Sequence, residues 1–259
     1  HNVVMYGPPG TGKTMLAQAF SQILPPLSFD EALETTAIHS IAGTLKDELV
    51  TNPPFRAPHH SASYVSLIGG GAIPKPGEVT LAHRGVLFLD EFPEFDRRVI
   101  DSLRQPLEER KVSISRARGS ALFPANFILI AAMNPCPCGN YGIKGKDCLC
   151  SPIQISRYQR KISGPILDRV DMWTEVSKVE HRALGEGSKQ TGETEAVKSR
   201  IARAREIQRE RFASLGLGAR TNAEIRANDL ISIVQLENDA KEILNTSAEK
   251  LDLSARGGS

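Results

Sequence analysis

The sequence lacks the features that mark several classes of protein. Its longest uninterrupted apolar run, residues 127–133, is much too short to cross a bilayer, and no basic start precedes an apolar segment of signal-peptide length. Neither sign of charge dominates, because 32 Lys and Arg stand against 30 Asp and Glu. These absences argue against a membrane protein, an exported protein and a disordered chain, so we expect a globular protein of the cytoplasm.

Cysteines are few, and their placement excludes a disulfide framework. All four fall within residues 136–150, so they cannot join distant parts of a 259-residue chain. Cys136 and Cys138, then Cys148 and Cys150, form two C-x-C pairs separated by nine residues. Four thiolates that reach one point suit a closed structural Zn²⁺ site, although the single-residue gaps are tighter than usual. Free or oxidised thiols are the alternative.

The two ends of the chain carry little information about the fold. The first residue is His1, and residues 3–6 already have the pattern of a buried strand, which favours a fragment of a longer protein. Residues 257–259 read Gly-Gly-Ser and resemble a tag or linker remnant.

Short apolar runs alternate with helical patterns over residues 1–183. Continuous apolar runs, typical of buried parallel strands, occur at residues 3–6, 86–89 and 127–132. Periodic apolar residues predict helices at residues 15–24, 29–41 and 97–110. Alternating residues on either side of Gly119 predict a hairpin. We therefore expect an α/β domain with a mostly parallel sheet sandwiched by helices.

A smaller helical region is expected to follow. Residues 184–194 are rich in Gly, Ser, Thr and Glu and are interpreted as a linker. Apolar residues spaced by three or four predict further helices over residues 193–212 and 228–246. We interpret residues 195–256 as a small helical lid.

A glycine loop lies between the first strand and the first helix. It fits the phosphate-binding pattern and reads Gly7-Pro8-Pro9-Gly10-Thr11-Gly12-Lys13-Thr14. Glycines let backbone N–H groups approach phosphates closely, and the helix N-terminus favours negative charge. We expect Lys13 to reach the β- and γ-phosphates of ATP and Thr14 to bind Mg²⁺. The alternative is an ordinary glycine turn before a helix.

Polar residues end the next two strands. Asp90 and Glu91 close the strand at residues 86–89, where Asp90 can hold Mg²⁺ through water and Glu91 can polarise the attacking water. An acidic pair after a strand can also be a helix cap. Asn134 ends the following strand, where its amide can hydrogen-bond the γ-phosphate or the water, or can form a turn before Pro135.

Four further strings extend these motifs over nearly the whole chain. They are FRAPHHSAS at residues 55–63, GGGAIPKPGE at residues 69–78, GVLFLDE at residues 85–91 and NPCPCG at residues 134–139. With the glycine loop they resemble the Mg-chelatase-like ComM (YifB) family of AAA+ ATPases. The resemblance implies an AAA+ P-loop NTPase fold and a homo-oligomeric ring, expected to be a hexamer, that binds ATP between subunits and moves DNA.

The same resemblance implies roles for individual residues. Asn134 becomes the sensor asparagine, and Arg169 the arginine finger that enters the neighbouring subunit's ATP site. Arg256 becomes the second sensor, which reaches the γ-phosphate from the lid. A surface salt bridge to Asp168 or Asp171 is the alternative for Arg169.

The resemblance also implies insertions in the ATPase core. One interrupts a helix and matches the Gly- and Pro-rich residues 45–79. Another is a hairpin that matches residues 110–124, before the strand that carries the sensor asparagine, and residues 136–150 form a cysteine insertion.

Basic residues gather on the predicted hairpin. Arg110, Lys111, Arg116 and Arg118 fall within nine residues that contain no acid. If the hairpin points into the channel of a ring, these cations meet the phosphates of single-stranded or branched DNA. We expect no base stacking and no sequence readout, because no aromatic residue lies among them. The alternative is a solvated hairpin whose charged edges resist aggregation.

Three other residues are assigned to structure rather than chemistry. His59 and His60 are adjacent in a Pro-rich segment and are expected to pack and to form hydrogen bonds rather than to bind a metal. Trp173 is expected in the core at the end of a strand.

The sequence therefore predicts an ATP-hydrolysing AAA+ module that uses Mg²⁺, assembles into a ring and acts on DNA, with Zn²⁺ as a structural ion. A magnesium-chelatase-type ATPase subunit that remodels a protein partner is the alternative. A nucleotide-gated scaffold with little turnover is a third possibility, which the complete Asp90-Glu91 pair disfavours.

Overall fold

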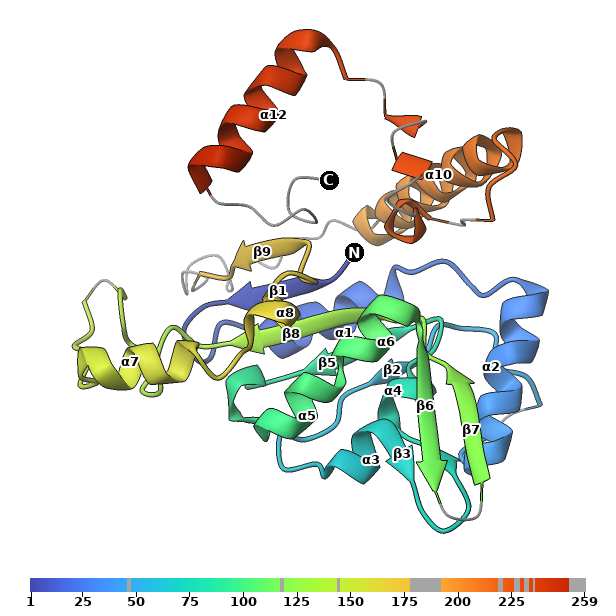
Figure 1. The fold of residues 1–259 in the computed structure, drawn as a ribbon, viewed down its shortest axis with the longest axis horizontal. Coiled ribbons are helices and arrows are strands. Elements are labelled where there is room, and N and C mark those ends of the chain that lie inside the picture. Colours follow the sequence, from blue (N-terminus) through green and yellow to red (C-terminus); the bar gives the residue numbers. More distant parts are fainter. Residues whose placement is uncertain are drawn as a thin grey trace. The chain divides into compact units, whose positions relative to one another are not determined.

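The computed structural model (Figure 1) describes residues 1–45, 48–116, 119–143, 145–177, 192–218, 221–225, 229–230, 233–234 and 236–251. The chain divides into two compact units, residues 1–194 and residues 195–259. Some predictions lie outside the described residues. They concern Arg118, Arg256, residues 184–191 of the expected linker and the C-terminal residues 257–259.

A parallel sheet forms the centre of the first unit. Its strands run in the order β2-β5-β8-β1-β9, and every neighbouring pair is parallel. Their bounds are β1 (Val3–Tyr6), β2 (Phe55–Arg56), β5 (Val86–Leu89), β8 (Ile128–Met133) and β9 (Met172–Glu175). The strands predicted at residues 3–6 and 86–89 are confirmed, and the third begins and ends one residue later than predicted. β8 lies between the strand that precedes the glycine loop and the strand that precedes Asp90.

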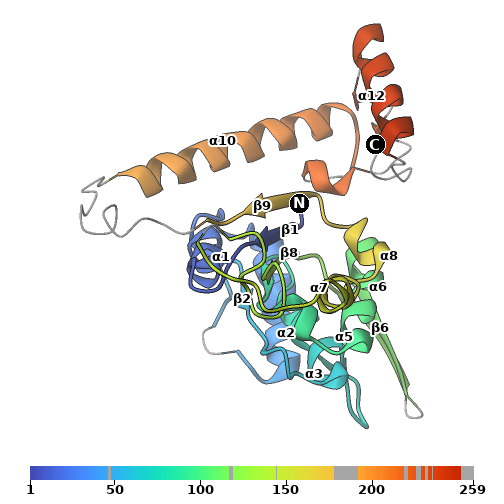
Figure 2. The ribbon, with the colours of Figure 1, turned by 90° about the vertical axis from the view of Figure 1, so that its left-hand side faces the viewer.

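Helices cover both faces of this sheet. Figure 2 shows α1 (Lys13–Gln22) on one side, and α5 (Arg97–Ser102) and α6 (Arg104–Glu109) on the other. Along β5, Leu87 and Leu89 belong to one buried cluster, and Val86 and Phe88 belong to another. A strand buried on both faces needs apolar residues at every position, which explains the continuous apolar runs. The predicted α/β fold, with a parallel sheet flanked by helices, is confirmed.

The second helix shows why the local sequence signals worked. α2 (Phe29–Ala42) begins at a capping box, in which Ser28 and Glu31 each accept a hydrogen bond from the other's backbone N–H. It ends at Gly43, whose φ of 70° lies in the left-handed region that favours glycine. The helix predicted at residues 29–41 is therefore confirmed to within one residue.

The helix predicted at residues 97–110 is wrong as a single element. The structure breaks it into α5 and α6, with Leu103 between them. Pro106 lies in the first turn of α6, where its missing N–H costs nothing. In one continuous helix its ring would clash with the carbonyl group of Ser102, so the helix restarts instead.

Short elements fill the Gly- and Pro-rich stretch before β5. They are α3 (Tyr64–Ile68), β3 (Gly69–Gly70), β4 (Lys75–Pro76) and α4 (Glu78–Leu81). A Cβ on Gly69 would lie 2.7 Å from Cδ1 of Ile114. This close approach packs the stretch against the predicted hairpin, so it belongs to the folded unit.

The hairpin itself is confirmed as β6 (Lys111–Arg116) and β7 (Gly119–Pro124). Val112, Ile114 and Phe123 enter the core of the first unit. The two strands extend away from the central sheet (Figures 1 and 2), so their far ends are the tip of a projection.

The second unit is helical in the part that the structure describes. α10 (Glu193–Ser214) extends two residues beyond the predicted 193–212, and η2 (Asn222–Glu224) follows it. α12 spans Asn238–Leu251. The prediction of one helix over residues 228–246 is wrong, because residues 234 and 236–237 are not helical.

Two observations concern apolar residues at the surface. Trp173, predicted to be in the core, is 53% exposed because β9 is an edge strand. Within the described residues, no helix combines the length and the apolar character needed to cross a bilayer.

Candidate nucleotide-binding site

The carboxyl ends of three adjacent strands bring the predicted residues together. β1 leads into the glycine loop, β5 into Asp90 and β8 into Asn134. The Oγ1 of Thr14 donates to Oδ2 of Asp90 at 2.7 Å, and Nζ of Lys13 donates to Oδ1 of Asn134 at 3.2 Å. The three strands are parallel neighbours, with β8 in the middle. Their carboxyl ends therefore lie at the same edge of the sheet, beside the glycine loop.

The glycine loop is closed around the Lys13 side chain. Its Nζ donates to the carbonyl oxygens of Gly7 at 2.8 Å and Pro8 at 2.9 Å, and the residue is 8% exposed. Burial lowers the pKa of Lys13, and the charge of Asp90 partly offsets this effect. A buried ammonium held mainly by neutral oxygens is suited to an anionic ligand, which would offset its lost hydration.

The N-terminus of α1 adds backbone donors to the same place. Its N-cap is Gly12, with a φ of 82°, and among the described residues no side chain caps the helix and no acid lies in its first turn. The backbone N–H groups of that turn therefore point toward any anion bound by the loop. Together with Thr14 and Asp90, whose oxygens are hard-cation ligands, the residues fit a nucleotide polyphosphate with Mg²⁺.

Glu91 lies next to Asp90 in an unusual backbone conformation. Its φ is 50°, in the left-handed region that residues other than glycine rarely adopt. Nδ1 of His60 lies 3.0 Å from Oε2 of Glu91, and Nδ1 of His59 lies 2.8 Å from Oγ of Ser61. The predicted hydrogen-bonding role of these histidines is confirmed. The sequence did not indicate that His60 meets Glu91, because nothing in the spacing links residue 60 with residue 91.

The four cysteines converge on one point beside the glycine loop. Their ligand atoms all lie within 4.8 Å of one another. The Sγ of Cys136 is 3.4 Å from that of Cys138, and the Sγ of Cys148 is 3.7 Å from both. Zinc–sulfur bonds of about 2.3 Å in a tetrahedron place sulfurs roughly 3.8 Å apart, so the cluster has the size of a zinc site.

The cysteine segment also touches the glycine loop. A Cβ built on Gly139 would lie 2.5 Å from Cδ of Pro9, so only glycine lets the two loops pack this closely. Cys136 is fully buried, two residues beyond Asn134. Hydrogen bonds, first from the backbone N–H of Asn140 and then from Cys136, lower the pKa of Cys138 to about 6, which favours its thiolate at neutral pH.

Arg169 lies beyond α8 (Gly164–Leu167) and is 7% exposed. Its guanidinium group donates to the carbonyl oxygen of Pro165 and forms an ion pair with Glu108 of α6. A surface salt bridge with Asp168 or Asp171 was the alternative expectation. The structure pairs this guanidinium with Glu108, and the residue is buried rather than at the surface.

The basic hairpin residues are only partly described. The Lys111 ammonium is half exposed and lies 3.6 Å from a carboxylate oxygen of Glu109. The backbone of Arg116 ends β6 at the tip of the hairpin.

Comparisons with known proteins agree with this arrangement. A family model described as "Magnesium chelatase, subunit ChlI" matches residues 1–184, and one for its C-terminal part matches residues 191–259. The chain is 44% identical over 258 residues to "Uncharacterized protein YifB" of Salmonella typhimurium and 45% identical over 258 residues to "Competence protein ComM" of Haemophilus influenzae. Each alignment covers 99% of this chain and 49% of the relative, so the chain spans about half their length.

A more distant similarity joins the chain to a DNA replication protein. It is 25% identical over 172 residues to "DNA replication licensing factor mcm-6" of Caenorhabditis briggsae, over 66% of this chain and 18% of that protein. The matches that cover 99% of this chain are the decisive ones. With the loop, the strand order and the polar strand ends described above, they show that this chain belongs to the magnesium chelatase ChlI-type family of AAA+ P-loop ATPases.

Proposed function

We propose that this chain binds and hydrolyses ATP at the ends of β1, β5 and β8. The observation that carries the proposal is the set of contacts joining Lys13 to Asn134 and Thr14 to Asp90 across three strands. Lys13 and the backbone N–H groups of residues 10–14 bind the phosphates. Thr14 and Asp90 hold Mg²⁺, which supplies charge neutralisation on the β- and γ-phosphates.

Glu91 orients and polarises the attacking water in this proposal. His60 fixes the direction of the Glu91 carboxylate, because its Nδ1 lies 3.0 Å from Oε2. Asn134 positions the γ-phosphate and the attacking water in this proposal. Its Oδ1 lies 3.2 Å from Nζ of Lys13, the ammonium that is proposed to bind this phosphate.

Arg169 completes the site of the neighbouring subunit in a ring. Within one subunit its guanidinium group forms an ion pair with Glu108. On assembly the guanidinium group must leave Glu108 and contact the γ-phosphate bound to the neighbouring subunit. Arg256 is proposed to reach the γ-phosphate of ATP from the lid. The expected oligomer is a hexamer, and a lone subunit should hydrolyse ATP slowly.

We further propose that DNA is the substrate on which this motor acts. The support is the basic hairpin with Lys111, Arg116 and Arg118, and the names of two relatives, a competence protein and a DNA replication licensing factor. Contacts of this kind involve phosphates rather than base edges, so binding should fall steeply with salt.

The test is the rate of ATP hydrolysis with and without single-stranded and forked DNA across a salt series. We expect DNA to raise the rate at low salt, and we expect the triple variant Lys111→Gln, Arg116→Gln, Arg118→Gln to lose that rise while it keeps its rate without DNA. Unchanged rates with DNA, in a preparation that forms rings, would contradict the DNA-motor function.

A second candidate is a protein-remodelling ATPase like the magnesium chelatase subunit that gives the family its name. The observation that favours it is the match of the ChlI model to residues 1–184. Stimulation of ATP hydrolysis by a protein partner, with none by DNA, would favour this candidate.

The cysteine cluster is proposed to hold one structural Zn²⁺. We expect Cys148→Ser to lose one zinc per chain by elemental analysis and to unfold at a lower temperature, by about 2–4 °C per kcal/mol of lost stability. Asp147→Asn, in the same loop, changes a carboxylate outside the cluster and should keep its zinc. Wild-type protein that melts at the same temperature with and without bound zinc would overturn the assignment.

A further inference from the structure

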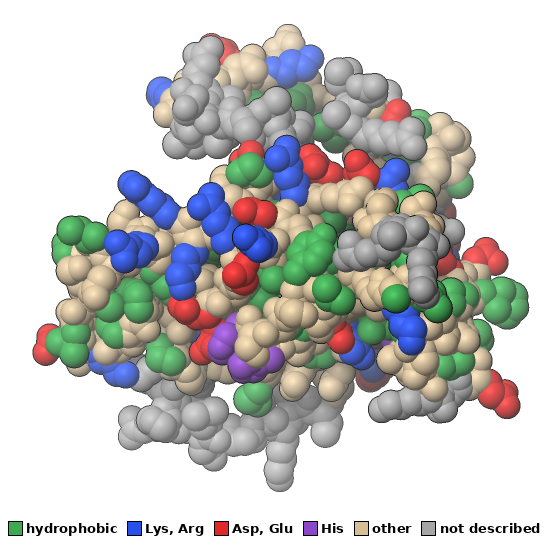
Figure 3. Space-filling model, turned by 60° about the horizontal axis from the view of Figure 1, so that its bottom comes forward, with side chains coloured by type: hydrophobic (Ala, Val, Ile, Leu, Met, Phe, Trp, Pro, Cys, Tyr) green, Lys and Arg blue, Asp and Glu red, His purple; other side chains and the backbone are tan. Residues whose placement is uncertain are grey.

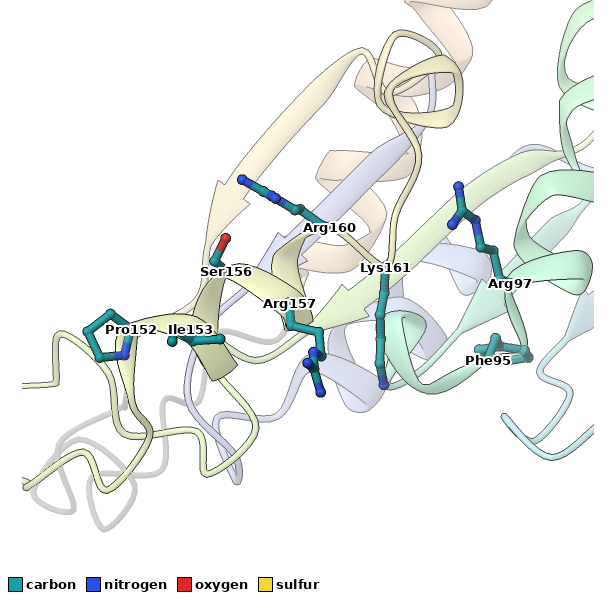
Figure 4. A pocket seen from close by; sticks show the side chains of 8 residues that line it. All are labelled: Phe95, Arg97, Pro152, Ile153, Ser156, Arg157, Arg160 and Lys161. Atoms are coloured by element: carbon teal, nitrogen blue, oxygen red, sulfur yellow. The ribbon is translucent and has the colours of Figure 1, made fainter.

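A pocket of about 830 Å³ lies outside the nucleotide-binding site. It opens between α7 (Pro152–Gln159) and the start of α5, and four of its lining side chains are basic: Arg97, Arg157, Arg160 and Lys161. Figure 4 shows the α7 side chains on one side of the pocket and Phe95 and Arg97 on the other, with Lys161 between them. The four cations come from two separate segments of the chain, which the fold alone brings together.

Acidic residues neutralise only two of these four cations. Nζ of Lys161 lies 2.9 Å from Oε2 of Glu94, and Nε of Arg97 lies 3.6 Å from Oδ2 of Asp101. Arg157 and Arg160 are exposed, and no carboxylate among the described residues pairs with either. Two unbalanced positive charges therefore face the pocket, and Figure 3 shows Lys and Arg side chains gathered on the side of the molecule where α7 lies in Figure 1.

The helix that carries Arg157, and whose C-terminus Arg160 caps, is firmly anchored. Ser151 and Gln154 form a capping box at its N-terminus, and Ile155 and Tyr158 are buried on its inner face. Arg157 lies in the last turn, where a cation is also favoured by the helix dipole. The dipole does not account for Arg97 and Lys161, which lie outside α7, so the gathering of charge needs another explanation.

We infer that this pocket binds backbone phosphates of the nucleic acid strand on which the motor acts. The inference rests on the proposed DNA function. An arginine guanidinium group can donate two parallel hydrogen bonds to two oxygens of one phosphate. Arg157 and Arg160 have no carboxylate partner among the described residues, so their guanidinium groups are available for such bonds. The exposed Ile153 provides apolar surface beside the charges, which suits the sugars of a strand.

The shape of the site favours a strand over a free phosphate ion. A single phosphate needs only a fraction of 830 Å³, whereas pockets of about 300–1,000 Å³ take whole small molecules. Arg157, Arg160 and Ile153 are all exposed, so the pocket is open to solvent. A nucleotide strand can therefore lie across it without inserting one of its ends. Free nucleotide and inorganic phosphate share the same chemistry and are therefore separate arms of the test.

The experiment measures binding of a labelled single-stranded oligonucleotide to the 259-residue chain by fluorescence anisotropy. The double variant Arg157→Gln, Arg160→Gln is expected to make the plot of log K against log salt shallower by about 1.4, and to weaken binding on the order of tenfold near 50 mM salt. The control variant Lys75→Gln, Arg98→Gln removes two exposed charges outside the pocket and should stay close to wild type. Melting temperature and binding of a fluorescent ATP analogue report that both variants are folded.

Three outcomes overturn the inference. Equal weakening in the pocket and control variants would mean that overall charge acts, not the pocket. A double variant that binds the oligonucleotide like wild type would contradict the inference, and if it also loses binding of inorganic phosphate, the pocket takes a small anion instead. Wild-type protein that binds no oligonucleotide would remove the proposed DNA function and this inference together, whereas the first two outcomes leave the DNA function standing.

Discussion

Glu91→Gln is expected to lower the rate of ATP hydrolysis by about 10²–10⁴-fold while ATP still binds. The amide keeps the size of the side chain and removes the carboxylate that is proposed to polarise the attacking water. The contact of Lys13 with the glycine loop and that of Thr14 with Asp90, which form the proposed phosphate and Mg²⁺ sites, do not involve Glu91 and stay in place. Hydrolysis is measured by phosphate release, and binding by titration with a fluorescent ATP analogue.

Glu94→Gln is the matched control for this change. Glu94 lies three residues further along, in η1 (Phe92–Glu94), and pairs with Lys161 at 2.9 Å. Its amide variant should hydrolyse ATP at close to the wild-type rate. If Glu91→Gln kept the wild-type rate as well, the water would be activated elsewhere and the proposed catalytic role of Glu91 would be wrong.

Arg169→Ala is expected to cause a comparable or greater loss, about 10³–10⁵-fold in assembled rings. The alanine removes the positive charge that is proposed to stabilise the transition state in the neighbouring subunit. Arg169 is the buried member of its ion pair with Glu108, so its loss also destabilises the fold, and thermal melting is measured beside the rate. Glu108→Gln breaks the same pair but keeps the arginine, and it should retain most of the activity.

Mixing two inactive variants separates action between subunits from a structural role. Arg169→Ala subunits have an intact Glu91, and Glu91→Gln subunits have an intact Arg169. Where the two meet in one ring, some interfaces contain both groups, so activity should return to a fraction of the wild-type rate. No recovery in rings shown to be mixed would mean that Arg169 does not act on its neighbour.

Local signals in the sequence were sufficient for most of the elements. Ser28 and Glu31 cap α2, and Gly43 ends it, because each of these effects involves residues a few positions apart. The continuous apolar runs required a sheet covered on both faces, and the structure has one. Where a local signal was misread, as at Pro106, the predicted helix was too long.

Contacts between distant residues were not predictable in the same way. His60 meets Glu91, Glu108 meets Arg169, and Gly139 packs on Pro9, yet no spacing in the sequence links the members of any pair. The exposure of Trp173 depends on β9 lying at the sheet edge, which is a property of the strand order.

The sequence by itself determined that this chain has a phosphate-type loop between a strand and a helix, an acidic pair and an asparagine at strand ends, and four clustered cysteines. Each is a short motif whose geometry is set by its own backbone. Only the tertiary structure decided that β8 lies between β1 and β5, so that Asn134 reaches Lys13 and Thr14 reaches Asp90. It also created the basic pocket beside α7, because a concentration of charge from separate segments exists only after the chain has folded.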